Sequence, residues 1–364
     1  MAEPANPTPG PPLLAWFDQA SELSSDLLGG KCRGLAEMTA AGLDVPPGFA
    51  ITTAANELFL EPALSHTRRH TQPVQAPVPG SGEIAPSADE VEGIHDLAAS
   101  LPMDEAVEAA VVAAYEELGR RVGLANPPVA VRSSGQSEDG KEASFAGQYD
   151  TYLWVVGSDA VLTAVKRVLV GSLTGSTLAY RVDRALGVGF TPMCVGVQLM
   201  VDARSAGVMF TLDPRNGDRS RVVVESSWGL GESVVRGDVR PDRISVNKVT
   251  GAINFEEIGD KVHEYRFDAS SGAVSAVPVD EARRVVPSLS DDEVSRLVSL
   301  GRKVERLRGS PQDTEWAIDH RGRLSLLQVR PETVWSAKVE AERTSEARPR
   351  RALDCVVSKF SGAD

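Results

Sequence analysis

The sequence has no run of about 18 apolar residues, the length that a membrane-spanning helix needs. Its start, MAEPANPTPGPP, has neither the basic segment nor the apolar segment of a secretion signal. Residues 1–12 are rich in proline and show no apolar periodicity, so they predict a disordered tail. We therefore expect a cytoplasmic protein with no membrane partner.

Cysteine and basic charge are also scarce. Cys32, Cys194 and Cys355 cannot form a disulfide framework in 364 residues, and none has the CxxC spacing of a zinc site. Ordinary packing explains all three. The formal net charge is −13, which argues against non-specific binding to nucleic acid or to an anionic membrane. An anionic ligand would have to be held by local positive charge.

A hydrophobic content of 42% over 364 residues is enough for two compact lobes. Composition and turn residues predict one lobe over 16–190 and a second over 191–335, followed by a charged tail over 336–364. A stretch at about 62–88, dense in Pro, Ser and Gly, predicts a surface insertion inside the first lobe. His66 and His70 fall in that insertion, where solvated side chains are favoured over a metal-binding pair.

Periodicity gives the main elements. Helical spacing predicts helices at 106–122, 160–170 and 175–186. The segment PVAVRSS predicts a strand at 128–134. From residue 193 onward, short β-rich runs separated by turns predict an antiparallel sheet.

A further helix is predicted to begin at Ser290, where SDDE forms a capping box. Its expected apolar face carries aliphatic side chains only: Val294, Leu297, Val298, Val304 and Leu307.

Two segments could hold phosphate. In GGKCRGL, two glycines allow a tight turn and Lys31 projects a positive charge just before a predicted helix, although a simple helix-entry turn would look the same. In VRSSGQSEDGKEASFAGQYDTYL, a strand that carries Arg132 runs into a loop of small and polar residues. Such a loop can wrap phosphates with backbone N–H groups, or it can be a solvated acidic loop around Glu138, Asp139 and Glu142.

The segments TEWAID and RLSLLQV predict a hairpin that turns at Arg321 and Gly322. Residues whose numbers sum to 643 then face each other, so Glu315 is opposite Gln328, and Asp313 is opposite Arg330.

Alternation puts these four polar side chains on one face of the hairpin. It puts Trp316, Ile318, Leu327 and Val329 on the other. The polar face could bind Mg²⁺ together with nucleotide phosphates. The pattern alone favours a solvated face, with Asp313 and Arg330 as an ordinary cross-strand pair, because exposed polar faces are usual in antiparallel sheets.

Taken in order, these segments resemble the ATP-binding domain of the phosphoenolpyruvate synthase and pyruvate phosphate dikinase family, which includes rifampin phosphotransferase and phenylphosphate synthase. The resemblance covers about 16–335 and rests on several ordered motifs: VRSSGQSEDGKEASFAGQYDTYL, VGVQLMV, AGVMFTLDPRNGD, SSWGLGESVVRGDVRPD, DTEWAID and LLQVRPETV. It implies an α+β fold of the ATP-grasp type, in which two lobes sandwich the nucleotide. The departures, Cys32 in GGKCRGL and SGQSED in the loop, are mild.

The resemblance also implies the site. The implied nucleotide-binding residues are Lys31, Arg132, Ser144, Gly147, Thr151, Gln198, Met200 and Val201. Ser144 to Gly147 match a loop that closes over the phosphates, and Gln198 to Val201 match a segment that packs along the adenine. Glu315 and Gln328 match the magnesium ligands. Arg330 matches the catalytic arginine, which acts beside the phosphate-contacting Lys31 and Arg132.

In this family the ATP domain transfers a diphosphoryl group to a histidine on a swivelling domain, and release of phosphate leaves AMP and phosphohistidine. His263 and His320 lack the surroundings expected of that histidine. The resemblance therefore implies ATP and Mg²⁺ as ligands and a separate histidine-bearing subunit as partner, as in phenylphosphate synthase, in an enzyme of the pyruvate, water dikinase type that is incomplete alone. The alternative is an ATP-binding regulatory subunit without transfer activity.

Overall fold

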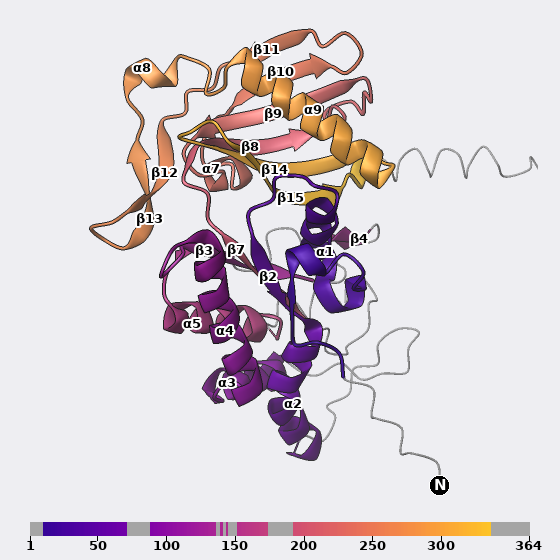
Figure 1. The fold of residues 1–364 in the computed structure, drawn as a ribbon, viewed down its shortest axis with the longest axis vertical. Coiled ribbons are helices and arrows are strands. Elements are labelled where there is room, and N and C mark those ends of the chain that lie inside the picture. Colours follow the sequence, from indigo (N-terminus) through magenta and orange to yellow (C-terminus); the bar gives the residue numbers. More distant parts are fainter. Residues whose placement is uncertain are drawn as a thin grey trace, which may run out of the picture.

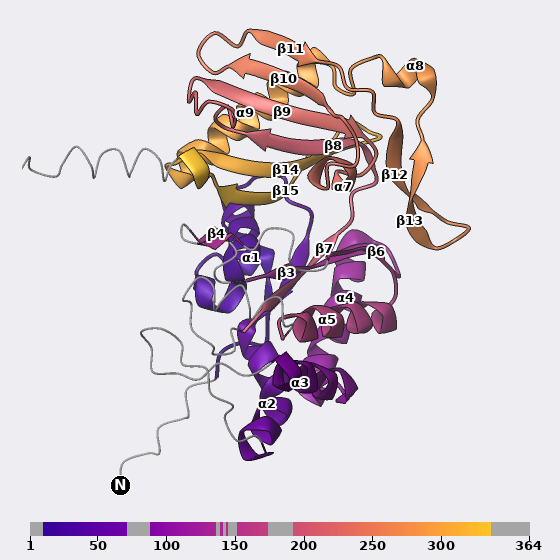
Figure 2. The ribbon, with the colours of Figure 1, turned by 180° about the vertical axis from the view of Figure 1, so that it is seen from behind.

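The described part of the protein is built around two large β-sheets, which lie one above the other in Figure 1 and are seen from behind in Figure 2. A computed structural model describes residues 10–70, 88–135, 139–140, 143–144, 151–173 and 192–335. The predicted tails, the second half of the proline-rich stretch and the helix expected at 175–186 lie outside the described residues. The mixed helix and sheet class predicted from the sequence is confirmed.

In the described residues, the first sheet has five strands in the order β1-β2-β7-β3-β6, and all neighbouring pairs are antiparallel. Its strands are β1 (Leu14–Trp16), β2 (Gly48–Ile51), β3 (Val129–Ser134), β6 (Thr151–Val155) and β7 (Cys194–Leu199). β3 agrees with the strand predicted at 128–134. The sequence pattern groups β7 with the later strands, but β7 pairs with β2 and β3, so this sheet extends beyond residue 190.

The helices that accompany the first sheet are α1 (Ser25–Ala40), α2 (Thr53–His70), α3 (Ala88–Ser100), α4 (Glu105–Val122) and α5 (Ser158–Gly171), with a short 3-10 turn η1 (Phe17–Gln19). α4 and α5 confirm two predicted helices. α2 continues through Pro62, so the insertion predicted from about residue 62 is wrong at its start. Proline removes the hydrogen bond to the carbonyl of Leu58, and Leu58 lies on the exposed side of the helix, 42% exposed, where water can replace that bond.

The second sheet has six strands in the described residues, in the order β11-β10-β9-β8-β14-β15, again antiparallel. Its strands are β8 (Ala203–Phe210), β9 (Arg221–Trp228), β10 (Asp242–Asn247), β11 (Ile253–Glu257), β14 (Gln312–Asp319) and β15 (Leu324–Pro331). One face is covered by α9 (Asp291–Arg308), which begins with the predicted capping box between Ser290 and Glu293. The expected apolar face of α9 is buried except at Leu307, which is 49% exposed.

Smaller elements connect these layers. They are α7 (Glu232–Val235), α8 (Glu281–Arg284), β4 (Asp139–Gly140), β5 (Ala143–Ser144), β12 (His263–Asp268) and β13 (Ala273–Pro278). β12 and β13 form a separate hairpin that projects from the second sheet beside the first lobe (Figure 1). Where the hairpin meets the first lobe, the ring of Phe267 stacks on the ring of Trp154, with centroids 4.9 Å apart.

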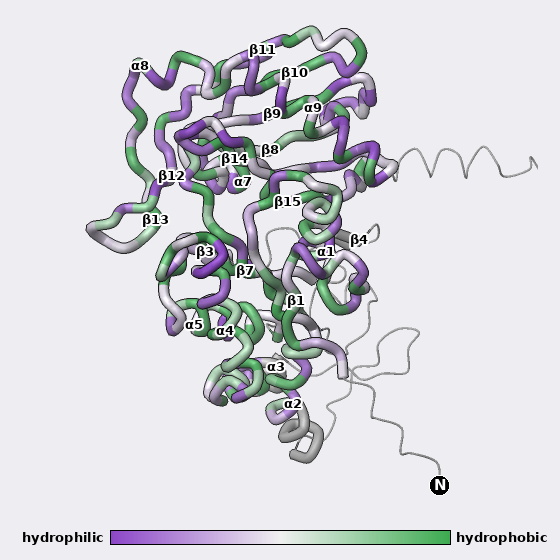
Figure 3. The backbone as a smooth tube through the Cα atoms, viewed as in Figure 1, coloured by the Kyte–Doolittle hydropathy of each residue, from purple (hydrophilic) through white to green (hydrophobic). Residues whose placement is uncertain are grey.

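The two lobes have separate hydrophobic cores. The first core packs α2 to α5 against the first sheet, and the second packs α9 against the second sheet. Hydrophobic residues run through β7, whereas hydropathy changes repeatedly along β10 and β11 (Figure 3). No helix in the described ranges is long and apolar enough to cross a bilayer.

α1 lies between the two lobes. Cys32 and Leu35 pack with residues of η1, β2 and β7, while Met38 packs with Val304 and Val329 of the second lobe. A Cβ on Gly34 would lie 3.0 Å from the backbone oxygen of Val329, so a glycine allows α1 to approach β15 closely. α1 is therefore anchored to both sheets.

Candidate functional site

A cavity of about 420 Å³ lies between the two sheets. One wall comes from β3, β6 and β7, and the other comes from β8, α7, β14 and β15. The lining residues include six of the predicted site residues: Arg132, Thr151, Gln198, Met200, Val201 and Glu315. Segments more than 180 residues apart in the sequence therefore meet in one cavity, since Arg132 contacts Glu315.

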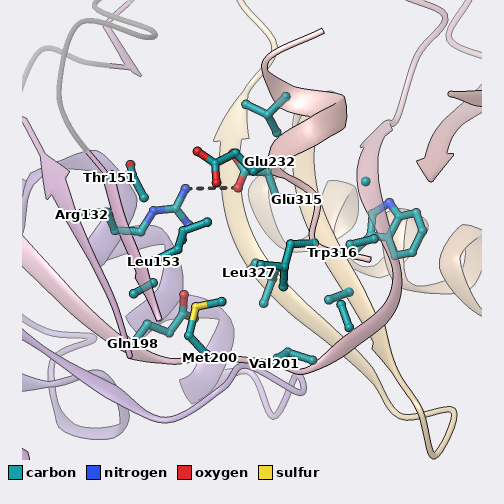
Figure 4. A pocket seen from close by; sticks show the side chains of 18 of the residues that line it. Arg132, Thr151, Leu153, Gln198, Met200, Val201, Glu232, Glu315, Trp316 and Leu327 are labelled. Carbon is teal, nitrogen blue, oxygen red and sulfur yellow. Dashed lines mark hydrogen bonds and ion pairs between the residues drawn. The ribbon is translucent and has the colours of Figure 1, made fainter. Parts of the chain in front are cut away.

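The polar end of the cavity is organised by Arg132. Its guanidinium donates a hydrogen bond of 2.7 Å to Oε1 of Gln328 and one of 3.1 Å to Oε2 of Glu315. Figure 4 shows the arginine pointing from the first-sheet wall toward Glu315. The predicted phosphate-binding arginine and both predicted metal ligands thus form one cluster.

The register of the hairpin explains this cluster. Glu315 pairs with Gln328, and Asp313 pairs with Arg330, as the sequence predicts. A bulge between Glu315 and Trp316 then shifts the register, so Trp316 faces Leu326. Beyond the bulge the predicted pairing is wrong.

The bulge also changes the face of one residue. Leu327 lines the cavity, although alternation alone puts it on the core side. Leu326 instead lies in the hydrophobic core with Val329. An extra residue on β15 causes this, because every side chain on the turn side of a bulge exchanges faces.

The charges around Glu315 determine its ionisation. Burial raises its pKa, but the positive charge and hydrogen bond of Arg132, with further contributions from Lys31 and Arg330, outweigh burial and lower the pKa below its usual value. The carboxylate therefore stays ionised across the neutral range. All three cations predicted from the sequence act on this one group.

Lys31 lies just after an interruption of α1. The helix is broken at Gly29, where φ is 64°, and resumes at Gly30, directly before Lys31. The GGK motif therefore contains both the tight turn and the positive charge that its sequence predicts. The resumed helix begins beside Ser134 at the end of β3, which also carries Arg132.

The other end of the cavity is lined by Gln198, Met200 and Val201 (Figure 4). Gln198 is 3% exposed, and its side-chain Nε2 has no hydrogen-bond partner among the described residues. Nε of Arg132 is likewise buried without a partner in the described chain. Buried donors of this kind are normally satisfied, so these residues fit a polar ligand with acceptor atoms at both ends of the cavity.

A family model described as "Pyruvate phosphate dikinase, AMP/ATP-binding domain" matches residues 25–351. The chain belongs to this family. "Phosphoenolpyruvate synthase" of Aeropyrum pernix is 39% identical over 365 residues, covering 93% of this chain and 44% of that protein. "Prodigiosin synthesizing transferase PigC" of Serratia marcescens is 35% identical, covering 91% of this chain and 34% of that protein. This AMP/ATP-binding domain thus spans less than half the length of these relatives.

The resemblance inferred from the motifs is confirmed. Two α+β lobes on either side of a cavity agree with the ATP-grasp arrangement expected of this AMP/ATP-binding domain. Among solved structures, D-cycloserine synthetase DcsG aligns with 83% of the chain at 12% identity and a TM-score of 0.29.

Some predicted residues of the AMP/ATP-binding domain are placed only in part. Ser144 lies in the two-residue strand β5, of which only the backbone is described, and Gly147 lies outside the described residues. The choice between a phosphate loop and a solvated acidic loop falls there too. Within the described ranges there is no cluster of three or more His, Cys, Asp or Glu side chains that could hold a metal.

Sequence reasoning missed the wall formed by α7. Glu232 and Arg236 line the cavity and form an ion pair at 3.2 Å. Burial raises the pKa of Glu232, and the charge of Arg236 opposes that shift.

The signal for this wall was the preceding glycine pair. Gly229 has φ 71°, and a Cβ there would lie 2.5 Å from the carbonyl oxygen of Tyr265. The SSWGLGES motif therefore makes a tight turn that brings α7 to the cavity.

Cys32 and Cys194 are both buried free thiols in one hydrophobic cluster. A hydrogen bond from Cys194, together with the charges of Lys31 and Arg132, lowers the pKa of Cys32 against the effect of burial. Burial raises the pKa of Cys194 well above its usual value. Their positions agree with ordinary packing behind the site.

Proposed function

We propose that this chain is a cytoplasmic phosphotransferase module that binds Mg-ATP between its sheets and transfers a diphosphoryl group to a histidine on a separate swivelling-domain partner. The observation that carries the proposal is the contact of Arg132 with both Glu315 and Gln328 inside the interlobe cavity. A cation between a carboxylate and an amide oxygen marks a place where positive charge is favoured. Mg²⁺ and nucleotide phosphates need such a place.

The residues divide the work by position. Gln198, Met200 and Val201 would contact the adenine, because they line the end of the cavity away from Arg132. Arg132, Lys31 and Arg330 would neutralise phosphate charge, because their charges already converge on Glu315. The loop from Ser144 to Gly147 would close over the phosphates, as the family motif implies, and Thr151 just beyond it would line the cavity from β6.

Glu315 and Gln328 would hold Mg²⁺, which supplies charge neutralisation at the phosphate oxygens. Their oxygens fit this ion because carboxylate and amide oxygens are its preferred ligands. Arg132 now donates to both oxygens, and its planar guanidinium can move to a phosphate when the nucleotide enters. The arginine would then orient the triphosphate and leave both oxygens to the metal.

The chemical step is in-line transfer. A histidine nitrogen forms a bond to the β-phosphorus, the bond between that phosphorus and the α-phosphate bridging oxygen breaks, and AMP leaves. Water then cleaves the remaining anhydride and releases phosphate. Arg330, on the polar face of the hairpin, would stabilise the negative charge on the transferred group.

The experiment measures nucleotide products from the purified chain with Mg-ATP, alone and with a separately expressed histidine-bearing swivelling domain. AMP and phosphate should appear only with the added domain, and Arg330→Ala should abolish them. The matched control, Arg321→Ala, changes an exposed arginine in the turn of the same hairpin and should retain activity. ADP as the main product would contradict the proposal.

A different outcome would favour the alternative function. If Mg-ATP binds but no AMP forms with the added domain, and Arg330→Ala leaves the nucleotide products unchanged, the chain is an ATP-binding regulatory subunit.

The relatives' names concern phosphoenolpyruvate synthesis and prodigiosin synthesis. The final acceptor for this chain is therefore to be sought among small organic acids first, with pyruvate as the first compound to test.

A further inference from the structure

The GGK motif interrupts α1 in an unusual way. In a continuous helix the N–H of Cys32 would bond to the carbonyl of Leu28, four residues earlier. Here the N–H of Cys32 donates to Oγ of Ser134 at 3.0 Å, and that hydroxyl donates to the carbonyl of Leu28 at 2.8 Å. A side chain from β3 is thus inserted into the hydrogen-bond ladder of α1, which is a known cause of a helix kink.

The backbone at this point fits only a glycine. Gly29 has φ 64°, and a Cβ there would lie 1.9 Å from the carbonyl oxygen of Ser134. The next residue, Gly30, donates its N–H to the carbonyl of Gly135 at 3.1 Å. The turn before Lys31 is therefore held against the end of β3 by three hydrogen bonds.

The three hydrogen bonds between α1 and the end of β3, which we call the junction, lie next to two positively charged residues, Lys31 and Arg132. Lys31 sits between Gly30 and Cys32, which are both bonded to the end of β3. Arg132 is two residues before Ser134 on β3, so the side chains of Arg132 and Ser134 lie on the same face of that strand. A shift of α1 relative to β3 would change the distance between the two positive charges.

Ser134 is fully buried and takes no part in the cavity wall. Its hydroxyl satisfies one acceptor and one donor of the interrupted helix, and no other described side chain bonds to either group. Without the hydroxyl, Cys32 and Leu28 could form the direct helical bond, which would straighten α1 and rotate Lys31 about the helix axis.

We propose that Ser134 is a positioning residue whose hydroxyl sets the location of Lys31 relative to Arg132, and thereby sets the affinity of the site for the triphosphate tail of the nucleotide. The proposal rests on the proposed binding of Mg-ATP. It assigns Ser134 no contact with the nucleotide. The effect of losing the hydroxyl should therefore depend on the number of phosphates in the ligand.

The experiment is calorimetric titration of wild type and Ser134→Ala with Mg-ATP and with AMP. Ser134→Ala should bind Mg-ATP about tenfold more weakly, which corresponds to ~1.4 kcal/mol. AMP affinity should change less than about twofold, because the adenine end of the cavity does not touch the junction. The ratio of the two affinities is the quantity that a purely structural role would not alter.

Ser133→Ala is the matched control. Ser133 is equally buried on the opposite face of β3, and its Oγ has no hydrogen-bond partner among the described residues. This variant should keep the wild-type ratio. If Ser134→Ala does not fold, Ser134→Cys keeps a side chain of similar shape with a weaker donor and should give an intermediate ratio.

The possible results separate the two proposals. Wild type that fails to bind Mg-ATP would overturn the proposed function. Wild type that binds, with a Ser134→Ala ratio equal to that of wild type, would overturn the positioning role and leave the proposed function standing. An equal loss for both nucleotides would also overturn it, because the defect would then extend to the whole cavity.

Discussion

Arg132 and Glu315 form an ion pair that is mostly hidden from water, with 16% of the arginine side chain and 21% of the glutamate side chain exposed. Removing one member of such a pair is costly, because the other charge keeps its desolvation penalty and loses its partner. Here Gln328 shares the arginine, so its amide oxygen would also lose a bond. The residue that organises the site is therefore also expected to stabilise the fold.

Arg132→Gln should lower the free energy of unfolding more at neutral pH than at acid pH. In wild type the pKa of Glu315 is lowered, so its contribution is present above the unfolded-state pKa of about 4.3 and is lost as pH falls through the folded-state pKa. Without Arg132, burial dominates and the folded-state pKa rises. The variant should lose about 1–3 kcal/mol of unfolding free energy at pH 7 and less near pH 4, measured by urea denaturation.

Arg296→Gln provides the comparison for this test. Arg296 pairs with Asp292 at 3.4 Å, but Asp292 is 84% exposed, so water already screens the pair. Its effect should be small at both pH values. A loss in Arg132→Gln that is equal at pH 7 and pH 4 would show that Glu315 does not carry the effect.

Single residues were predictable where local geometry decides them. The pairing of Glu315 with Gln328 follows from counting outward from the turn at Arg321 and Gly322, and the structure agrees. The count fails at Leu327 because no residue in RLSLLQV marks the bulge. The contact between Arg132 and Glu315 joins two different sheets, so no local rule could give it.

At the scale of elements, the hairpin of β12 and β13 stands apart from the second sheet and reaches the first lobe. Its base is fixed to the SSWGLGES segment by a hydrogen bond of 3.0 Å from the N–H of Leu230 to the carbonyl of Tyr265. Its far contact is the stack of Phe267 on Trp154, whose φ of 58° is unusual for a bulky residue. The stack thus helps to hold a strained backbone on β6.

Phe267→Ala should loosen this contact. Aromatic stacks contribute about 0.5–1.5 kcal/mol beyond the area they bury, so the loss should be about 1 kcal/mol. Hydrogen exchange should become faster in residues 263–278 and 151–155 and stay unchanged in β8 and β9. Mass spectrometry of peptides from these segments measures the difference.

Tyr265→Phe serves as the control on the same hairpin. It removes an exposed hydrogen bond of 3.1 Å to Asp238 and keeps the ring. Exchange at 151–155 should stay as in wild type. Unchanged exchange at 151–155 in Phe267→Ala would mean that the stack does not couple the lobes.

A helix or strand was predictable where its residues follow a single hydrophobic period and a residue pattern marks where it begins or ends. The helix at α9 shows both, with its apolar face and the Ser290 capping box. The short strand β2 was missed because all four of its residues are buried, so it has no alternation to detect. β7 was assigned to the wrong sheet for a related reason, since strand pairing is a long-range property.

For the whole molecule, the site is shared between two lobes that have separate cores. A ligand held by both walls should stabilise both lobes together. Mg-ATP at 100 times its dissociation constant should raise the unfolding free energy by ~2.7 kcal/mol, and calorimetry should show the transitions of the two lobes moving closer together.

Glu315→Gln tests that expectation. It keeps the size of the side chain but removes the carboxylate that the proposed Mg²⁺ needs, so stabilisation by Mg-ATP should fall while the transitions without nucleotide still reveal any direct effect. Stabilisation of only one lobe by Mg-ATP in wild type would contradict binding across the cavity.

The position of α1 has a mechanical consequence. On its side of the molecule, Asp44 just beyond the helix accepts two bonds of 2.7 Å from Arg323 of the other lobe, and Arg308 pairs with Glu37. On the far side, beyond the cavity, the hairpin meets the first lobe where Phe267 stacks on Trp154, and Tyr265 and Val274 pack into the same hydrophobic cluster as Leu153. If the lobes rotate about an axis near α1, where these ion pairs lie, the mouth of the site opens at the hairpin edge. Lys31 and its junction with β3 would then stay almost stationary while the opposite wall swings.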